Sequence, residues 1–89
     1  MSQPNNIKDC FEKSIQQVKN LDNNKKPSDD ILLRLYGLYK QITLGNINTN
    51  KPSIFNYKLL KKWESWNECK DMETEKAQQK YIDIVNSFI

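Results

Sequence analysis

The 89-residue sequence contains no histidine, only two glycines and only two cysteines. Without histidine the chain lacks the commonest general base near neutral pH and the usual ligands of most zinc sites. Gly37 and Gly45 alone cannot build either of the glycine-rich loops that cradle nucleotide phosphates, so any phosphate must be held in another way. Cys10 and Cys69 could form at most one bridge, and we expect both as free thiols packed as small apolar side chains. These absences argue against nucleophilic and metal-dependent catalysis, and we expect neither a metal nor a cofactor.

Long apolar runs are also missing from the sequence. No stretch approaches the ~20 apolar residues of a membrane span, and residues 1–9 lack the apolar segment of a secretory signal. We therefore expect a cytoplasmic protein without stable membrane insertion, folded as a single domain over residues 1–89. The net charge of +3 is mild. It fits an anionic small molecule at least as well as a nucleic acid, whose binding domains tend to be more basic.

Apolar residues recur with helical spacing in four stretches, and the alternation typical of strands is nearly absent. The second stretch follows Ser28, a favourable N-cap, and Gly45 is placed to end it. The connection over residues 46–56 is longer than the ~2–8 residues usual in small bundles. A connection of this length can cross the molecule from end to end and let the flanking helices run parallel. We predict an all-α four-helix bundle. Its helices cover residues 7–21, the stretch from the N-cap at 28 to the stop at 45, residues 57–69, and a last stretch from 73 or 74 to 88.

The apolar stripes predict which side chains face the core. In the third helix, Leu59, Trp63 and Trp66 recur at i, i+4 and i+7, so we expect these three to form its buried face. The cleanest stripe lies in the fourth helix and comprises Ala77, Tyr81, Ile84, Val85 and Phe88.

Three groups of residues suggest a ligand site. Tyr36 and Tyr39 lie on one face of the second helix with Lys40 at its edge. Tyr81 interrupts the apolar stripe of the last helix with a polar tip. The third helix combines lysines with tryptophans, namely Lys58, Lys61, Lys62, Trp63 and Trp66. Taken singly, each group is better explained by core aromatic rings beside a solvated basic face.

Taken together, these segments resemble the acyl-CoA-binding protein family, which is also described as diazepam-binding-inhibitor-like. The resemblance is carried by L-Y-x-x-Y-K-Q, G-x-x-N-T-x-x-P and K-W-x-x-W-N-E, in the order and spacing of the family, and it covers residues 27–85. The N-terminal helix fits more loosely. The resemblance implies a four-helix bundle of up-down-down-up topology, with a shallow bowl that holds the acyl chain beneath the nucleotide head.

The resemblance also implies roles for individual residues. Tyr36 borders the acyl chain and the head group, Tyr39 stacks against the adenine, and Lys40 holds the ribose 3′-phosphate. Lys62 is a second phosphate-side lysine, and Tyr81 contacts the nucleotide. Leu32 and Leu33 line the acyl chain. Lys61 lies near the path of the acyl chain, where the family often has a small residue. The further ligand-binding positions are Lys19, Gly37, Leu38 and Lys58.

The function implied is that of an intracellular carrier and buffer. It binds medium- to long-chain fatty acyl-CoA esters, such as palmitoyl-CoA or myristoyl-CoA, reversibly and without catalysis. We expect a monomer that meets acyl-CoA-using enzymes transiently and binds no nucleic acid. The alternatives are a helical protein-interaction bundle, a bundle for single-stranded nucleic acid whose binding would weaken steeply with salt, and an acyl-CoA isomerase, since this kind of domain can accompany one.

Overall fold

The computed structural model describes residues 6–89 of the chain. The expectation of no secretory signal in residues 1–9 therefore lies partly outside the described residues, as does the first part of the predicted domain. Within the described range the chain forms helices and no strand. The helices are α1 (Ile7–Lys19), α2 (Asp29–Leu44), α3 (Tyr57–Asn67) and α4 (Thr74–Asn86), with a short 3-10 helix (Asn23–Lys25) after α1.

The ends of the helices follow from local hydrogen bonding. Ser28 Oγ accepts the backbone N–H of Ile31 at 3.4 Å and caps α2, and Gly45 ends this helix with a φ of 85°. The other three helices end two residues before their predicted ends. In each, the last predicted residue donates its N–H to the carbonyl three positions earlier, because the final turn tightens. These residues are Leu21, Cys69 and Phe88.

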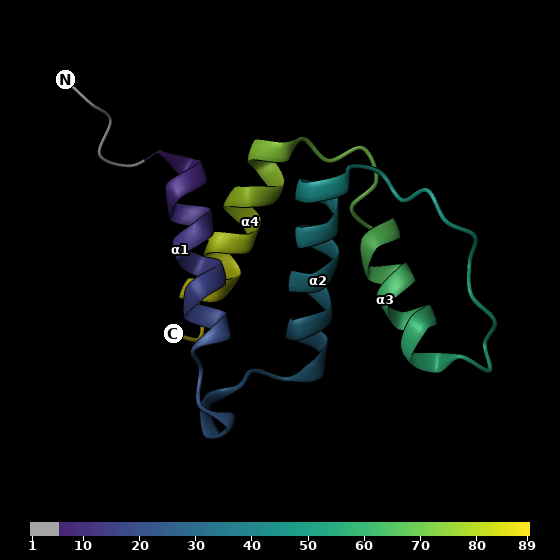
Figure 1. Ribbon diagram of the computed structural model, residues 1–89, viewed down its shortest axis with the longest axis horizontal. Helices are drawn as coiled ribbons and strands as arrows, with labels where there is room; N and C mark the ends of the chain where they lie inside the picture. The colour runs from purple at the N-terminus through teal and green to yellow at the C-terminus, as the bar shows by residue number, and fades with distance from the viewer. Residues whose placement is uncertain (1–5) are drawn as a thin grey trace.

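The helices have the up-down-down-up arrangement that the family resemblance implied, and the helices on either side of the long connection run parallel, as its length predicted. Figure 1 shows α2 and α3 running in one direction and α1 and α4 in the other, with the segment after α2 returning along the molecule to the start of α3. α4 packs against both α1 and α2. Among the described residues α3 packs on no helix except α2, and α1 and α2 do not pack on each other. No helix–helix packing therefore fills the region between α1 and α2.

The core lies where α4 meets α1 and α2. Phe11 and Tyr81 form an edge-to-face pair with ring centroids 5.1 Å apart. Leu35 and Leu38 extend this cluster from α2. The predicted stripe of α4 packs here, joined by Ile82, which the stripe did not include.

The predicted buried face of α3 is wrong at Leu59. Trp66 is buried and Trp63 is half-buried, but Leu59 is 51% exposed while its neighbour Leu60 is buried. Leu59 does lie on the apolar stripe. The stripe faces an open hollow at this turn rather than the core, because α3 has only α2 to pack against.

Both cysteines are free thiols, as predicted. Cys69 is buried in the core, whereas Cys10 is half-buried. Burial raises the pKa of the Cys69 thiol, and the neighbouring Glu68 carboxylate raises it further against the opposite effect of Arg34 and Lys80. We expect a thiol reagent to modify Cys10 about tenfold or more faster than Cys69 in the native protein. The modification rate of the remaining thiol in Cys10→Ser and in Cys69→Ser variants tests this. The two rates should become equal only after denaturation, and equal rates in the native proteins would contradict the prediction.

No helix in the described part of the chain is long and apolar enough to cross a lipid bilayer.

Candidate ligand-binding site

Two lysines from different helices meet at one aromatic ring. Lys40 lies one turn after Tyr36 on α2, and its Nζ is 5.7 Å from the centroid of the Tyr36 ring. Lys62 reaches the same ring from α3, with its Nζ at 5.4 Å. The Lys40 ammonium is also 5.4 Å from the ring of Trp66. Cation–π attraction can hold both ammonium groups in place without neutralising them.

The positive charge of this pair is not cancelled by a carboxylate. Within residues 6–89 the single ion pair joins Lys61 Nζ to Glu64 Oε1 at 3.9 Å. Neither Lys40 nor Lys62 therefore has an acidic partner in that range. Two uncompensated ammonium groups in the wall of one hollow favour an anion with more than one charge, such as a phosphate.

The crossing connection forms the outer wall of this site. The Trp63 indole donates to Thr49 O at 2.9 Å, and the Trp66 indole donates to Gly45 O at 2.8 Å. These two bonds hold the connection against α3 and leave a hollow of about 260 Å³. Its walls are Tyr36, Lys40, Thr49, Pro52, Leu59, Lys62, Trp63 and Trp66. Sequence reasoning did not identify Thr49 and Pro52 as walls, although both lie in the G-x-x-N-T-x-x-P segment.

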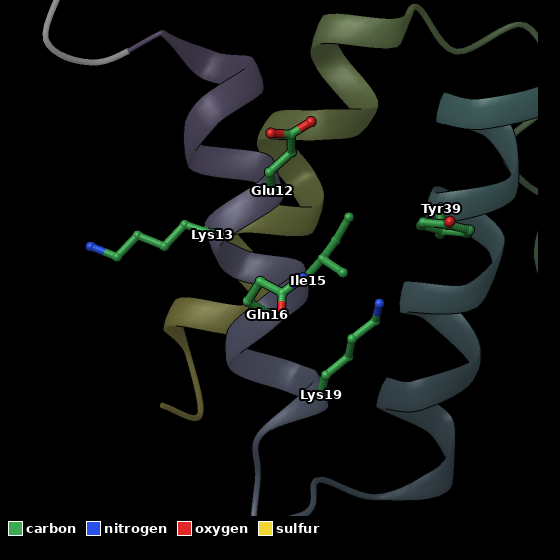
Figure 2. Close-up of a pocket in the computed structure, with 6 residues that line it drawn as sticks. All are labelled: Glu12, Lys13, Ile15, Gln16, Lys19 and Tyr39. Atoms are coloured by element: carbon green, nitrogen blue, oxygen red, sulfur yellow. The ribbon is translucent and has the colours of Figure 1, made fainter.

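A second hollow opens on the other side of α2, where α1 and α2 do not pack. Figure 2 shows Tyr39 turned from α2 into this space, with Ile15 and Lys19 turned into it from α1. Its volume is about 450 Å³. Lys19 and Tyr39, each predicted as a ligand residue, thus line the same hollow. Tyr39 is 42% exposed, so part of its side chain is accessible to a flat partner.

Tyr81 belongs to the buried core cluster and does not line this hollow. Its side chain is only 5% exposed. Burial raises the pKa of its hydroxyl, and the nearby Tyr39 phenol raises it further. A hydroxyl whose pKa lies above its usual range stays protonated at neutral pH and can donate a hydrogen bond.

A third hollow, of about 600 Å³, lies between the first turns of α2 and α3. Leu32 and Leu33 supply apolar surface, and Lys62 is shared with the hollow at Tyr36. The Lys61 ammonium lies 5.5 Å from the centroid of the Tyr57 ring. Sequence reasoning missed Tyr57, Asp29 and Asp30 in this wall. The full lining is Asp29, Asp30, Leu32, Leu33, Tyr57, Lys58, Lys61 and Lys62.

Eight of the eleven predicted ligand residues therefore line three hollows that share α2. Of the other three, Tyr81 is buried in the core, and Gly37 and Leu38 have packing roles. Leu38 is 4% exposed within the core, so its side chain presents almost no surface to a ligand. Gly37 faces α3, where a Cβ would lie 2.2 Å from Ser65 O. This position has no side chain because the two helix backbones nearly touch.

The chain is similar to known proteins in both sequence and fold. The family model described as "Acyl CoA binding protein" matches residues 8–85. A Drosophila melanogaster acyl-CoA-binding protein homolog is 40% identical over 93% of this chain and 94% of its own length. The crystal structure of Oryza sativa acyl-CoA-binding protein 2 superposes with a TM-score of 0.83 and 35% identity, covering 93% of this chain and 90% of that one. Human enoyl-CoA delta isomerase 2 is 43% identical over 86% of this chain, but the match spans only 19% of that enzyme.

Proposed function

The chain belongs to the acyl-CoA-binding protein family, and we propose that it carries and buffers fatty acyl-CoA esters by binding them reversibly. The observation that carries this proposal is the convergence of Lys40 and Lys62 over Tyr36, beside a hollow with leucines in its wall. A ligand suited to both features has several negative charges at one end and a long apolar chain at the other. Acyl-CoA esters have this chemistry.

We assign the phosphates to the lysine pair. Lys40 is proposed to hold the ribose 3′-phosphate and Lys62 a second phosphate, each by a charge-assisted hydrogen bond of roughly 1.5–3 kcal/mol. The exposed Tyr39 ring stacks on the adenine, for about 1–3 kcal/mol. Lys19 lines the same hollow as Tyr39, and we assign Lys19 and the Tyr81 hydroxyl as further donors to the nucleotide.

We assign the acyl chain to the hollow between α2 and α3. Leu32 and Leu33 contact the chain, while Tyr36 borders it where the head group begins. Lys58 stands at the rim of the same hollow. Burial contributes about 0.8 kcal/mol per methylene, so sixteen carbons offer on the order of 10 kcal/mol before the cost of ordering the chain. With the head-group contacts, this is enough for nanomolar binding, which corresponds to about −12 kcal/mol.

We propose that binding shields the thioester and leaves it chemically unchanged. The walls of the two hollows on the α3 side of α2 consist of lysines, aromatic and apolar side chains, Thr49, Asp29 and Asp30. They contain no histidine and no cysteine, and we propose that none of these side chains acts as a nucleophile with a partner base. The match to the isomerase is to a small portion of that enzyme, which supports a binding role for the shared region. We further propose a cytoplasmic monomer that delivers its ligand to acyl-CoA-using enzymes in transient encounters, since reversible carriage needs an open bowl.

Affinity is expected to rise steeply with acyl chain length and then level off. Each added methylene strengthens binding until the hollow is filled. Calorimetric titration with acyl-CoA esters of increasing length measures this directly. Free palmitate serves as the control for the head group, and we expect it to bind at least about a hundredfold more weakly than palmitoyl-CoA. Equal affinities for these two ligands would indicate a general lipid groove and contradict the proposal.

A further inference from the structure

The bend that joins the crossing connection to α3 exposes four large apolar side chains within six residues. Ile54 is 72% exposed, Phe55 94%, Tyr57 65% and Leu59 51%. Single exposed apolar residues are ordinary, but a run of this kind marks an interaction surface. We call these four residues the apolar bend. It lies at the edge of the molecule, at the end of α3 far from the link to α4 (Figure 1).

Local hydrogen bonds hold the tip of the bend outward. Asn56 N–H donates to Ser53 O at 2.9 Å, and Phe55 N–H donates to Ser53 Oγ at 3.1 Å. This closes a turn with Ile54 and Phe55 at its two central positions. Turn positions are most often occupied by small or polar residues such as glycine, asparagine, aspartate, serine or proline. Ile54 and Phe55 are largely exposed at these positions and do not belong to the core cluster, so they are available to contact a partner.

Lysines flank the apolar bend in the sequence. The segment from Lys51 to Trp63 contains four lysines and no acidic residue. Lys51, Lys58 and Lys62 are exposed, and Lys61 lies over the Tyr57 ring. Glu64 pairs with Lys61, and Asp29 and Asp30 lie in the wall of the third hollow. Protruding apolar side chains flanked by lysines complement an anionic lipid surface.

We infer that the apolar bend docks the protein on anionic membranes, with Ile54 and Phe55 inserted among the lipid headgroups and the lysines against the lipid phosphates. A protein partner would instead favour a flat apolar patch with a polar rim. The docking itself does not depend on the proposed function, but its consequence for acyl transfer rests on that function. Tyr57 belongs both to the apolar bend and to the third hollow. Docking therefore places the mouth of the proposed acyl site at the lipid surface, where an acyl chain can pass between bilayer and protein.

Vesicle sedimentation tests this inference. We expect the protein to bind phosphatidylcholine vesicles containing about 30% phosphatidylserine, and to bind pure phosphatidylcholine vesicles at least about tenfold more weakly. The double variant Ile54→Ser/Phe55→Ser should lose about tenfold or more of the binding to anionic vesicles. Leu44→Ser is the matched control, because Leu44 is 59% exposed but lies at the end of α2. It should bind the vesicles as the unmodified protein does.

Titration of the same variants with palmitoyl-CoA separates this inference from the proposed function. Ile54 and Phe55 line none of the three hollows, so ligand affinity should be unchanged in the double variant. Vesicle binding that is absent in the unmodified protein, or equal in the double variant, would overturn the inference. If the unmodified protein binds anionic vesicles but does not bind palmitoyl-CoA, docking is supported and the carrier function is refuted.

Discussion

Replacing both Lys40 and Lys62 with alanine is expected to weaken palmitoyl-CoA binding about a hundredfold or more. The two ammonium groups lie within 5.7 Å and 5.4 Å of the same ring centroid, with no carboxylate partner among residues 6–89. Each substitution should remove one charge-assisted contact with a phosphate. Screening by solvent and salt keeps the resulting loss of binding free energy at the lower end of the range for such contacts. Calorimetric titration gives the affinity, and each single variant should lose about tenfold.

The controls for this result separate a local contact from net charge. Lys70→Ala/Lys76→Ala removes the same charge at the end of the molecule where α3 is linked to α4, and it should change affinity by less than about threefold in physiological salt. Helical content should be unchanged in both double variants. A comparable loss of affinity in the control would mean that overall charge, and not the lysine pair, attracts the ligand.

Replacing Gly37 with alanine is expected to lower the free energy of unfolding by about 3 kcal/mol. The added methyl would lie 2.2 Å from Ser65 O and 2.5 Å from Ser65 C. These are backbone atoms of α3, so no side-chain rotation can relieve the clash, and α2 is the sole helix on which α3 packs in the described range. Thermal unfolding should begin more than about 10 °C lower.

Loss of ligand affinity should accompany this loss of stability, because the site needs Lys62 on α3 close to Tyr36 on α2. Thr43→Ala on the same helix is the control. Thr43 is exposed, and its replacement should change stability by less than about 0.5 kcal/mol. A Gly37→Ala protein as stable as Thr43→Ala would show that the two helices are not in such close contact.

Helix content and topology were predictable from the sequence because they depend on local signals. Ser28 and Gly45 mark the ends of α2, and the length of residues 46–56 allows a parallel α2 and α3. The stripe of α3 was harder to interpret. Leu59 has the spacing of a core residue but lies over a hollow. Periodicity identifies an apolar face, yet it cannot distinguish a face covered by protein from one left open for a ligand.

The candidate site was predictable mainly through family motifs. Those motifs carried Tyr36, Lys40 and Lys62, which the structure brings to one point. They did not separate Gly37 from its neighbours, because its close approach to Ser65 involves a residue 28 positions later and appears only in three dimensions. The apolar bend was likewise missed, since Ile54 and Phe55 show no helical period and their exposure depends on the turn at Ser53.

A thermodynamic cycle that combines one change in the protein with one change in the ligand tests the lysine–phosphate contact most directly. The measurement compares palmitoyl-CoA with its 3′-dephospho analogue, by calorimetric titration of the unmodified protein and of Lys40→Ala. If Lys40 holds that phosphate, removing the phosphate weakens binding to the unmodified protein by about tenfold or more, and binding to the variant by less than about twofold. Equal losses in the two proteins would show that Lys40 and the phosphate do not meet.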